Sequence, residues 1–199
     1  MPDFSELLDH GPFIRLPDML PGQTSSPLER YLGHYGLDAL RSEDIAVHAG
    51  HLEAGGFRLW AQLWTPRKPR GTVFVVHGYF DHHALYRHLL AHLLHNGWQV
   101  ALWDLPGHGL SSGEPASIDD FGDYVGCLQA FQDYLEDHSL APHPWFGIGQ
   151  STGRLEEVSF HDFGDDFAAV ITEEGGDAIV AGHAYGQWIA KTIASDHPD

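Results

Sequence analysis

The stretch TVFVVHG (residues 72–78) decides the fold, because it is short, almost wholly apolar and rich in β-branched residues. Such a run is typical of a strand that is covered on both faces in a parallel sheet. Two later runs, WQVALWD (98–104) and PWFGIG (144–149), have the same character. We therefore expect three buried strands that lie in one sheet.

Helical patterns separate these three strands. In residues 83–96 the apolar side chains fall on one helical face, and Asn96-Gly97 ends the pattern; they are Leu85, Tyr86, Leu89, Leu90, Leu93 and Leu94. In residues 117–137 apolar residues recur at three- and four-residue spacing. A strand, helix, strand, helix and strand in this order predict an α/β fold with a mostly parallel sheet and right-handed crossovers.

The residues before the first buried strand predict an antiparallel hairpin. Residues 45–64 alternate apolar and polar side chains, and Gly55-Gly56 supplies the turn. Trp60 and Trp64 lie on the otherwise polar side, where they either contact the N-terminal arm, which we favour, or line an apolar binding surface. We expect that arm, residues 1–44, to be extended with a short helix near 28–40.

Composition and charge restrict the class of protein. The 199 residues are 43% hydrophobic, which is enough for one domain with a substantial core. A formal net charge of -18 disfavours nucleic acid and anionic lipid surfaces as partners. Because there is one cysteine, no signal peptide and no apolar run long enough to span a membrane, we expect a cytoplasmic protein without a transmembrane segment.

The Gly-x-Ser-x-Gly pattern occurs twice, at residues 109–113 and 149–153. In α/β enzymes this pattern carries a nucleophilic serine when a strand runs directly into it and a helix follows. The second copy, GQSTG, follows the strand PWFGIG, whereas the first lies in a loop that continues into Glu114-Pro115. We therefore predict Ser151 as the catalytic nucleophile and Ser111 as a loop residue.

The segment HGYF (77–80) predicts an oxyanion hole at the end of the first buried strand. Ligands in open α/β sheets collect at the carboxyl ends of the strands, where backbone N–H groups can stabilise a developing oxyanion. We expect the backbone N–H groups of Tyr79 and Thr152 to be the donors. The alternative is that His77-Gly78 forms only a turn that ends the strand.

Three segments together, HGYFDHHALYRHLL, WQVALWDLPGHGLSSG and GIGQSTG, resemble the lysophospholipase and monoacylglycerol-lipase branch of the α/β-hydrolase family over residues 45–153. The resemblance implies a serine hydrolase that cleaves carboxylic esters with an acyl chain, such as an acylglycerol or a lysophospholipid, through a Ser-Asp-His triad. It also implies that Asp104, His108 and Ser111 have a mainly structural role. The elbow departs from the family pattern at Arg154.

The tail, residues 154–199, resembles the elbow region of a different α/β-hydrolase. Residues 163–172 are helical in pattern, 177–182 read as a strand, and GHAYG (182–186) has the elbow spacing with Ala184 at its apex. We favour a composite or truncated hydrolase, incomplete at the C-terminus, whose last strands are replaced by a repeat of the elbow unit. The alternative is a nonstandard triad completed from the acids Asp162, Asp165, Asp166 and Asp177 and the bases His161, His183 and His197.

No cofactor is expected. His88, His92 and His95 share one helical face, but zinc sites commonly draw on ligands from separate elements, so a solvated face explains them better. The glycine-rich loop 104–113 lacks the lysine that a phosphate-binding loop requires. The second function class is a hydrolase-like protein without catalysis that binds an apolar ligand or a partner.

Overall fold

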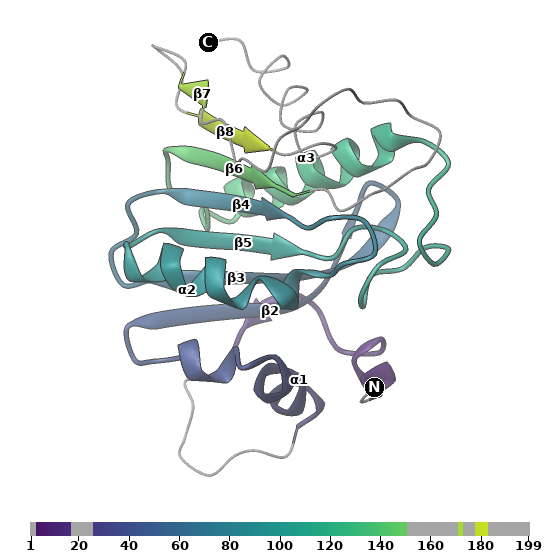
Figure 1. The fold of residues 1–199 in the computed structure, drawn as a ribbon, viewed down its shortest axis with the longest axis horizontal. Coiled ribbons are helices and arrows are strands. Elements are labelled where there is room, and N and C mark those ends of the chain that lie inside the picture. Colours follow the sequence, from purple (N-terminus) through teal and green to yellow (C-terminus); the bar gives the residue numbers. More distant parts are fainter. Residues whose placement is uncertain (1–2, 17–25, 151–170, 173–177, 183–199) are drawn as a thin grey trace, which may run out of the picture.

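The computed structural model describes residues 3–16, 26–150, 171–172 and 178–182. In these residues an eight-stranded sheet has the strand order β1-β2-β3-β5-β4-β6-β8-β7. Helices cover both of its faces, and the carboxyl ends of β4, β5 and β6 share one edge (Figure 1). The chain thus has the α/β architecture that the sequence predicts.

Four neighbouring strands form the parallel centre of the sheet. They are β5 (Gln99–Trp103), β4 (Thr72–Val76), β6 (Trp145–Gly149) and β8 (Ala178–Gly182). Every residue of β4 and β5 is buried, as expected for strands covered on both faces. The three predicted strands and the strand predicted at 177–182 are therefore confirmed.

The predicted hairpin consists of β2 (Ile45–Ala54) and β3 (Phe57–Pro66). Gly55 and Gly56 form its turn with φ values of 59° and 82°, a left-handed conformation that a two-residue hairpin turn needs and glycine adopts readily. β3 also pairs with β5 in antiparallel orientation. The hairpin therefore extends the central sheet on one side.

The N-terminal arm contains more structure than its sequence suggests. It forms η1 (Ser5–Leu7), β1 (Ile14–Arg15), α1 (Pro27–Tyr35) and η2 (Asp38–Leu40). The prediction of one helix to residue 40 is wrong, because Gly36 adopts a left-handed φ of 67° and ends α1 there. Three short elements thus accompany the one α-helix of the arm, two before it and one after it.

The helix predicted over 83–96 begins with a tighter turn, η3 (His83–Tyr86), and continues as α2 (Arg87–His95). Leu85 was expected on the buried face but is 52% exposed, because it lies in this tighter turn before the α-helical periodicity begins. The helix predicted over 117–137 is α3 (Phe121–Asp137), which begins four residues later because the side chain of the preceding Asp120 accepts the Gly122 N–H over 2.7 Å and caps the helix there.

Two hydrophobic clusters lie on opposite faces of the sheet. One contains the buried side of α3, and the other contains residues of the arm and of α2. Trp60 and Trp64 are fully buried in the second cluster, and the ring of Tyr31 in α1 lies 6.0 Å from that of Trp60. The prediction of a contact with the arm is confirmed for Trp60, and Trp64 lies in the same cluster as residues of the arm.

The tail differs from its predicted pattern at β7 (Ile171–Thr172). Both residues were predicted as the end of a helix over 163–172, but they pair in antiparallel orientation with β8. Their β-branched side chains favour this extended conformation. Residues 163–170 and the repeated elbow at 183–186 lie outside the described residues. None of the described helices is long and apolar enough to cross a membrane.

Candidate active site at the carboxyl ends of the strands

The predicted nucleophile follows a strand that lies directly beside β4. Val76, the last residue of β4, is in register with Gly149, the last residue of β6. The N–H of Gln150 then donates to the carbonyl oxygen of Val76 over 3.1 Å. Ser151 and Thr152 lie outside the described residues, so their roles stay predictions. The described chain nevertheless brings the end of β6 to the start of the loop that carries Tyr79.

Hydrogen bonds hold the loop after β4 in one conformation. The hydroxyl of Tyr86 accepts the N–H of Gly78 over 3.0 Å and donates to Oδ2 of Asp81 over 3.1 Å. The N–H of Asp81 closes a turn onto the carbonyl oxygen of Gly78 at 3.1 Å. Burial raises the pKa of the Tyr86 hydroxyl, so it stays protonated and keeps both roles.

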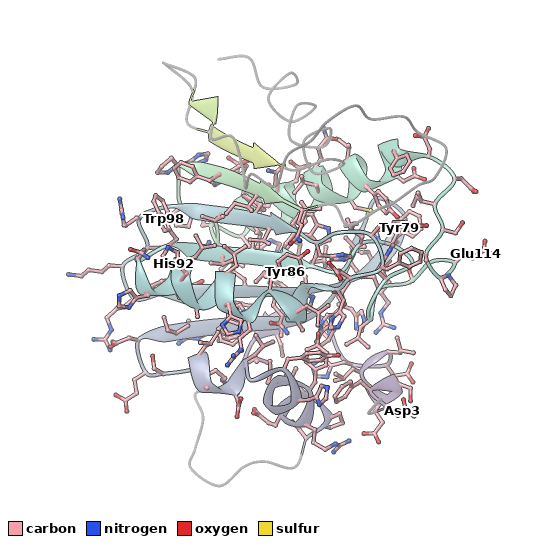
Figure 2. The ribbon with its side chains drawn as sticks, viewed as in Figure 1. Asp3, Tyr79, Tyr86, His92, Trp98 and Glu114 are labelled. Carbon is pink, nitrogen blue, oxygen red and sulfur yellow. The ribbon has the colours of Figure 1, made fainter. Side chains whose placement is uncertain are left out.

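Tyr79 is fixed by its side chain as well as by its loop. Its hydroxyl donates to the carbonyl oxygen of Ala116, and its ring lies 5.1 Å from that of His108. Figure 2 shows Tyr79 near the carboxyl ends of the parallel strands. The next residue, Phe80, has a left-handed φ of 65° and is 76% exposed. The role of the Tyr79 N–H in an oxyanion hole stays a prediction.

His77 connects the loops after β4 and β5. Its Nε2 accepts the N–H of Leu105 over 2.9 Å, so the ring proton is on Nδ1, which donates to the carbonyl oxygen of Gly78 over 2.8 Å. Burial lowers the pKa of His77 to about 4, and the ring is therefore neutral near pH 7. Because both ring nitrogens are occupied, His77 does not serve as the base for a serine in this conformation.

A second buried histidine, His83, forms a hydrogen-bonded pair with Asp104 that the sequence patterns did not predict. Nδ1 of His83 lies 2.6 Å from Oδ1 of Asp104, and the two side chains are 1% and 0% exposed. Asp104 also accepts the N–H groups of His83 and Leu110, each over 2.9 Å. The pair thus joins the start of η3 to the loop after β5.

The charge of Asp104 is stabilised by these partners. Burial alone would raise the pKa of its carboxyl, but the charge of His83 and the hydrogen bond from it hold that pKa well below its usual range. Gly109 allows this arrangement, because its φ is 52° and a Cβ there would overlap the carboxylate. The structural role that the family resemblance implies for Asp104 fits this geometry.

Ser111 is part of the same loop and has no free hydroxyl. Its Oγ donates to the carbonyl oxygen of Asp104 over 2.6 Å and accepts the N–H of Trp60 over 2.9 Å. No helix follows it directly in the described residues, since the loop continues to Asp120. The prediction that Ser111 is a loop residue is confirmed.

The other histidine predictions have different outcomes. His88, His92 and His95 are exposed on α2, so the solvated face is confirmed. The acids and bases proposed from the tail, among them His161, lie outside the described residues. His83 was missed because the pair His82-His83 after a strand carries no pattern that distinguishes a buried residue from a solvated one. The partner of His83 is Asp104 in the loop after β5, and only the folded chain brings these two side chains together.

The family comparison covers the same loops. The family model described as serine aminopeptidase, S33, matches residues 67–155. The range includes the segment with Tyr79, the loop with Asp104 and the predicted elbow at Ser151. The resemblance to α/β-hydrolases that the sequence suggested is therefore confirmed for this part of the chain.

Curated relatives match the same half of the chain. A monoacylglycerol lipase from Mycolicibacterium smegmatis is 36% identical over 101 residues, which cover 50% of this chain and 35% of that protein. A phospholipase from Bacillus subtilis is 27% identical over 97 residues, 49% of this chain and 36% of that protein. The chain thus spans about a third of the length of these relatives.

Solved structures of hydrolases are also similar. A cold-adapted esterase from an Arctic intertidal metagenomic library has a TM-score of 0.44 at 23% identity, covering 56% of this chain and 53% of that one. Epoxide hydrolase A from Mycobacterium thermoresistibile has a TM-score of 0.42 at 23% identity, covering 53% of this chain and 31% of that one.

Proposed function

We propose that this chain, whose residues 67–155 match a serine hydrolase family, cleaves carboxylic esters with an acyl chain. The observation that carries the proposal is the pairing of β4 with β6, in which Gln150 donates to Val76. This pairing brings the residue before the predicted nucleophile beside the loop that holds Tyr79. A serine elbow and an oxyanion loop on adjacent strands are what acyl transfer requires.

The proposed reaction has two steps. Ser151 attacks the ester carbonyl, and the N–H groups of Tyr79 and Thr152 stabilise the oxyanion that forms. A histidine takes the serine proton and delivers it to the leaving alcohol. Water then attacks the acyl-enzyme and releases the carboxylic acid. The tight loop around Gly78 supports this role, because a preformed donor does not have to reorganise during the reaction.

The proposed substrate is an acylglycerol or a lysophospholipid. The two curated relatives are named as a monoacylglycerol lipase and a phospholipase, which supports an ester with one acyl chain. The formal net charge of -18 favours uncharged or zwitterionic lipid over anionic lipid. To distinguish the two substrate types, the rate of hydrolysis is compared for a monoacylglycerol and for a lysophosphatidylcholine with the same acyl chain.

A second candidate is a hydrolase-like protein that binds an apolar ligand without cleaving it. The observation in its favour is that both nitrogens of His77 are occupied and that Nδ1 of His83 is held by Asp104. His77 thus has no free ring nitrogen, and the His83 side chain is only 1% exposed.

Labelling with a fluorophosphonate probe separates the two candidates, because the probe reacts with an activated serine. We expect the wild-type chain to be labelled, Ser151→Ala to lose the label, and Ser111→Ala to keep it. Ser111→Ala is the matched control, since it removes a serine from the same Gly-x-Ser-x-Gly pattern. Circular dichroism must show that both variants are folded. A folded wild-type chain without label, or label retained by Ser151→Ala, contradicts the hydrolase proposal.

A further inference from the structure

Phe80 combines a strained backbone with a solvent-exposed ring. Its φ is 65°, and at 76% it is the most exposed of the large hydrophobic residues that the structure describes. A left-handed φ brings the Cβ of any residue other than glycine close to the following carbonyl oxygen, which destabilises the fold. An exposed ring contributes little burial of apolar surface to offset that cost. The stability of the fold therefore does not explain a phenylalanine at this position.

The turn that contains Phe80 ordinarily carries a different residue at this position. The N–H of Asp81 donates to the carbonyl oxygen of Gly78 over 3.1 Å, so residues 78–81 form a β-turn with Phe80 as its third residue. Tyr79, the second residue, is not among the described residues with a positive φ, so the turn has the pattern of type II. Glycine or asparagine is the usual third residue of such a turn. Phenylalanine there is a departure that its side chain has to explain.

Backbone strain gathers around Tyr79. Apart from glycines, the described residues with a left-handed φ are Phe80, Ala116 and Ser139. Ser139 follows the end of α3, where this conformation is ordinary. Phe80 is the neighbour of Tyr79 in the chain, and the carbonyl oxygen of Ala116 accepts the Tyr79 hydroxyl. Strained residues cluster at functional sites, so the strain at Phe80 indicates a role for its side chain.

Phe80 lies one residue from the predicted oxyanion donor. Successive Cα atoms are about 3.8 Å apart, and an N–H group holds a carbonyl oxygen at about 2.9 Å. An ester whose carbonyl oxygen is bound by the Tyr79 N–H therefore has its reacting carbon within reach of the Phe80 side chain. The rings of Phe80 and Tyr79 are 4.6 Å apart and meet edge to face at 69°. The Tyr79 ring thus supports one side of the Phe80 ring.

We propose that Phe80 determines substrate specificity by binding the acyl chain of the ester, an inference that rests on the proposed function. A hydrocarbon chain that packs on the ring removes apolar surface of both partners from water. The alcohol part of an acylglycerol carries hydroxyl groups, which gain little from an apolar ring. The acyl chain is therefore the part of the substrate that lies on Phe80, beside the carbonyl group that Tyr79 binds.

Two isomeric esters, ethyl octanoate and octyl acetate, test which part of the substrate contacts Phe80. They have the same composition, but the long chain is on the acyl side in the first and on the alcohol side in the second. Phe80→Asn removes the ring and places a residue that tolerates a left-handed φ. We expect the ratio of kcat/KM for ethyl octanoate to that for octyl acetate to fall about tenfold. This fall corresponds to lost contact with about two methylene groups.

Two further variants separate the apolar side chain from other effects. Phe80→Leu keeps an apolar side chain and should keep the ratio within about threefold of the wild-type value. Ile14→Ala is the control, because Ile14 is also an exposed apolar residue, at 54%, but lies in β1, four strands away from β4. It should leave the ratio unchanged. The loss in Phe80→Asn should appear mainly as a higher KM, since chain binding acts on the ground state and the transition state alike.

Thermal unfolding distinguishes a substrate-binding role from a structural one. Phe80→Asn should have the same Tm as the wild-type chain or a higher one, because asparagine relieves the strained turn and the lost ring is exposed. A lower preference for ethyl octanoate together with an unchanged or higher Tm supports the proposal. A lower Tm with an unchanged ratio of the two esters would assign the ring to the stability of the fold.

A binding measurement without turnover separates this inference from the proposed function. Isothermal titration calorimetry with 1-O-octylglycerol, an ether that cannot be hydrolysed, compares Ser151→Ala with the double variant Ser151→Ala and Phe80→Asn. We expect binding to be about tenfold weaker in the double variant. Equal binding, or an unchanged ester ratio in folded Phe80→Asn, overturns the role of Phe80. A wild-type chain that hydrolyses neither ester contradicts the proposed function instead, and the titration still decides whether Phe80 binds the chain.

Discussion

His83 and Asp104 form a buried hydrogen-bonded pair in which Nδ1 of His83 lies 2.6 Å from Oδ1 of Asp104. The pair joins the beginning of η3 to the loop after β5, two segments that are distant in sequence. An acid beside a histidine is also the arrangement of a catalytic triad, but both side chains here are inaccessible and the acid accepts two further N–H groups. Its role in the described structure is to hold the loops together.

Asp104→Asn should destabilise the fold strongly. The amide replaces one carboxylate oxygen with a donor, so at least one of the buried N–H groups that Asp104 accepts loses its partner, which costs about 1 to 3 kcal/mol. Urea unfolding measures the change in free energy. Asp119→Asn is the control, because Asp119 is exposed and should change stability by less than about 0.5 kcal/mol. A loss of under about 1 kcal/mol for Asp104→Asn would show that the pair contributes little.

Gly109→Ala should destabilise the chain more than Gly56→Ala. Both glycines have a left-handed φ, which costs an alanine about 1 to 2 kcal/mol. A Cβ at Gly56 meets no atom, whereas a Cβ at Gly109 overlaps the carboxylate of Asp104, which three hydrogen bonds hold in place. The difference between the two unfolding free energies should exceed about 1 kcal/mol. Equal losses would mean that the Asp104 loop can relax.

Stability should fall as the pH drops from about 6.5 to 4, in part because of His77. Its pKa is about 4 in the folded chain and about 6.5 in the unfolded chain, so the unfolded chain binds more protons in this window. The neutral ring of His77 contributes fully to the free energy of unfolding above pH 6.5. About 3 kcal/mol of this contribution is lost when the pH falls to 4.

Urea unfolding at several pH values measures the contribution of His77. The variant His77→Gln removes the titrating ring, and its unfolding free energy should vary less with pH between 4 and 6.5. His48→Gln is the comparison, since the pKa of the less buried His48 is also lowered and it should contribute a smaller part. Parallel pH profiles for wild type and His77→Gln would contradict the assignment.

Tyr86→Phe tests whether the loop that carries Tyr79 is held in place for the reaction. The variant loses the acceptor for the N–H of Gly78 and the donor to Asp81, which should cost about 1 to 2 kcal/mol of stability. If the chain is an esterase, kcat should fall while KM changes little, because the oxyanion forms only during the reaction. A lower stability with unchanged kcat would limit Tyr86 to a structural role.

Local sequence patterns predicted the strands, turns and loops whose conformation depends mainly on their own residues. The strands at Thr72–Val76 and Gln99–Trp103 are continuous apolar runs, and Gly55-Gly56 allows only a narrow choice of turn. Ser111 could be separated from Ser151 because no helical pattern follows it. In each case the signal lies within about ten residues of the feature that it predicts.

Features that depend on distant residues were not predicted. No residue near His83 in the sequence indicates that its side chain is buried, since its partner Asp104 lies in the loop after β5. Ile171–Thr172 form a strand because β8 is available to pair with them, which overrides their helical periodicity.

The short strand β1 has a consequence for the association of this chain with other molecules. Ile14 and Arg15 pair with Ala49 and His48 of β2, which otherwise would be the outermost strand on that side. An uncovered strand of this length offers a row of hydrogen-bonding groups to any extended peptide. Deleting the arm would therefore do more than weaken the core. It would expose the edge of β2, and we would expect folded molecules to associate by pairing their β2 strands and then to aggregate.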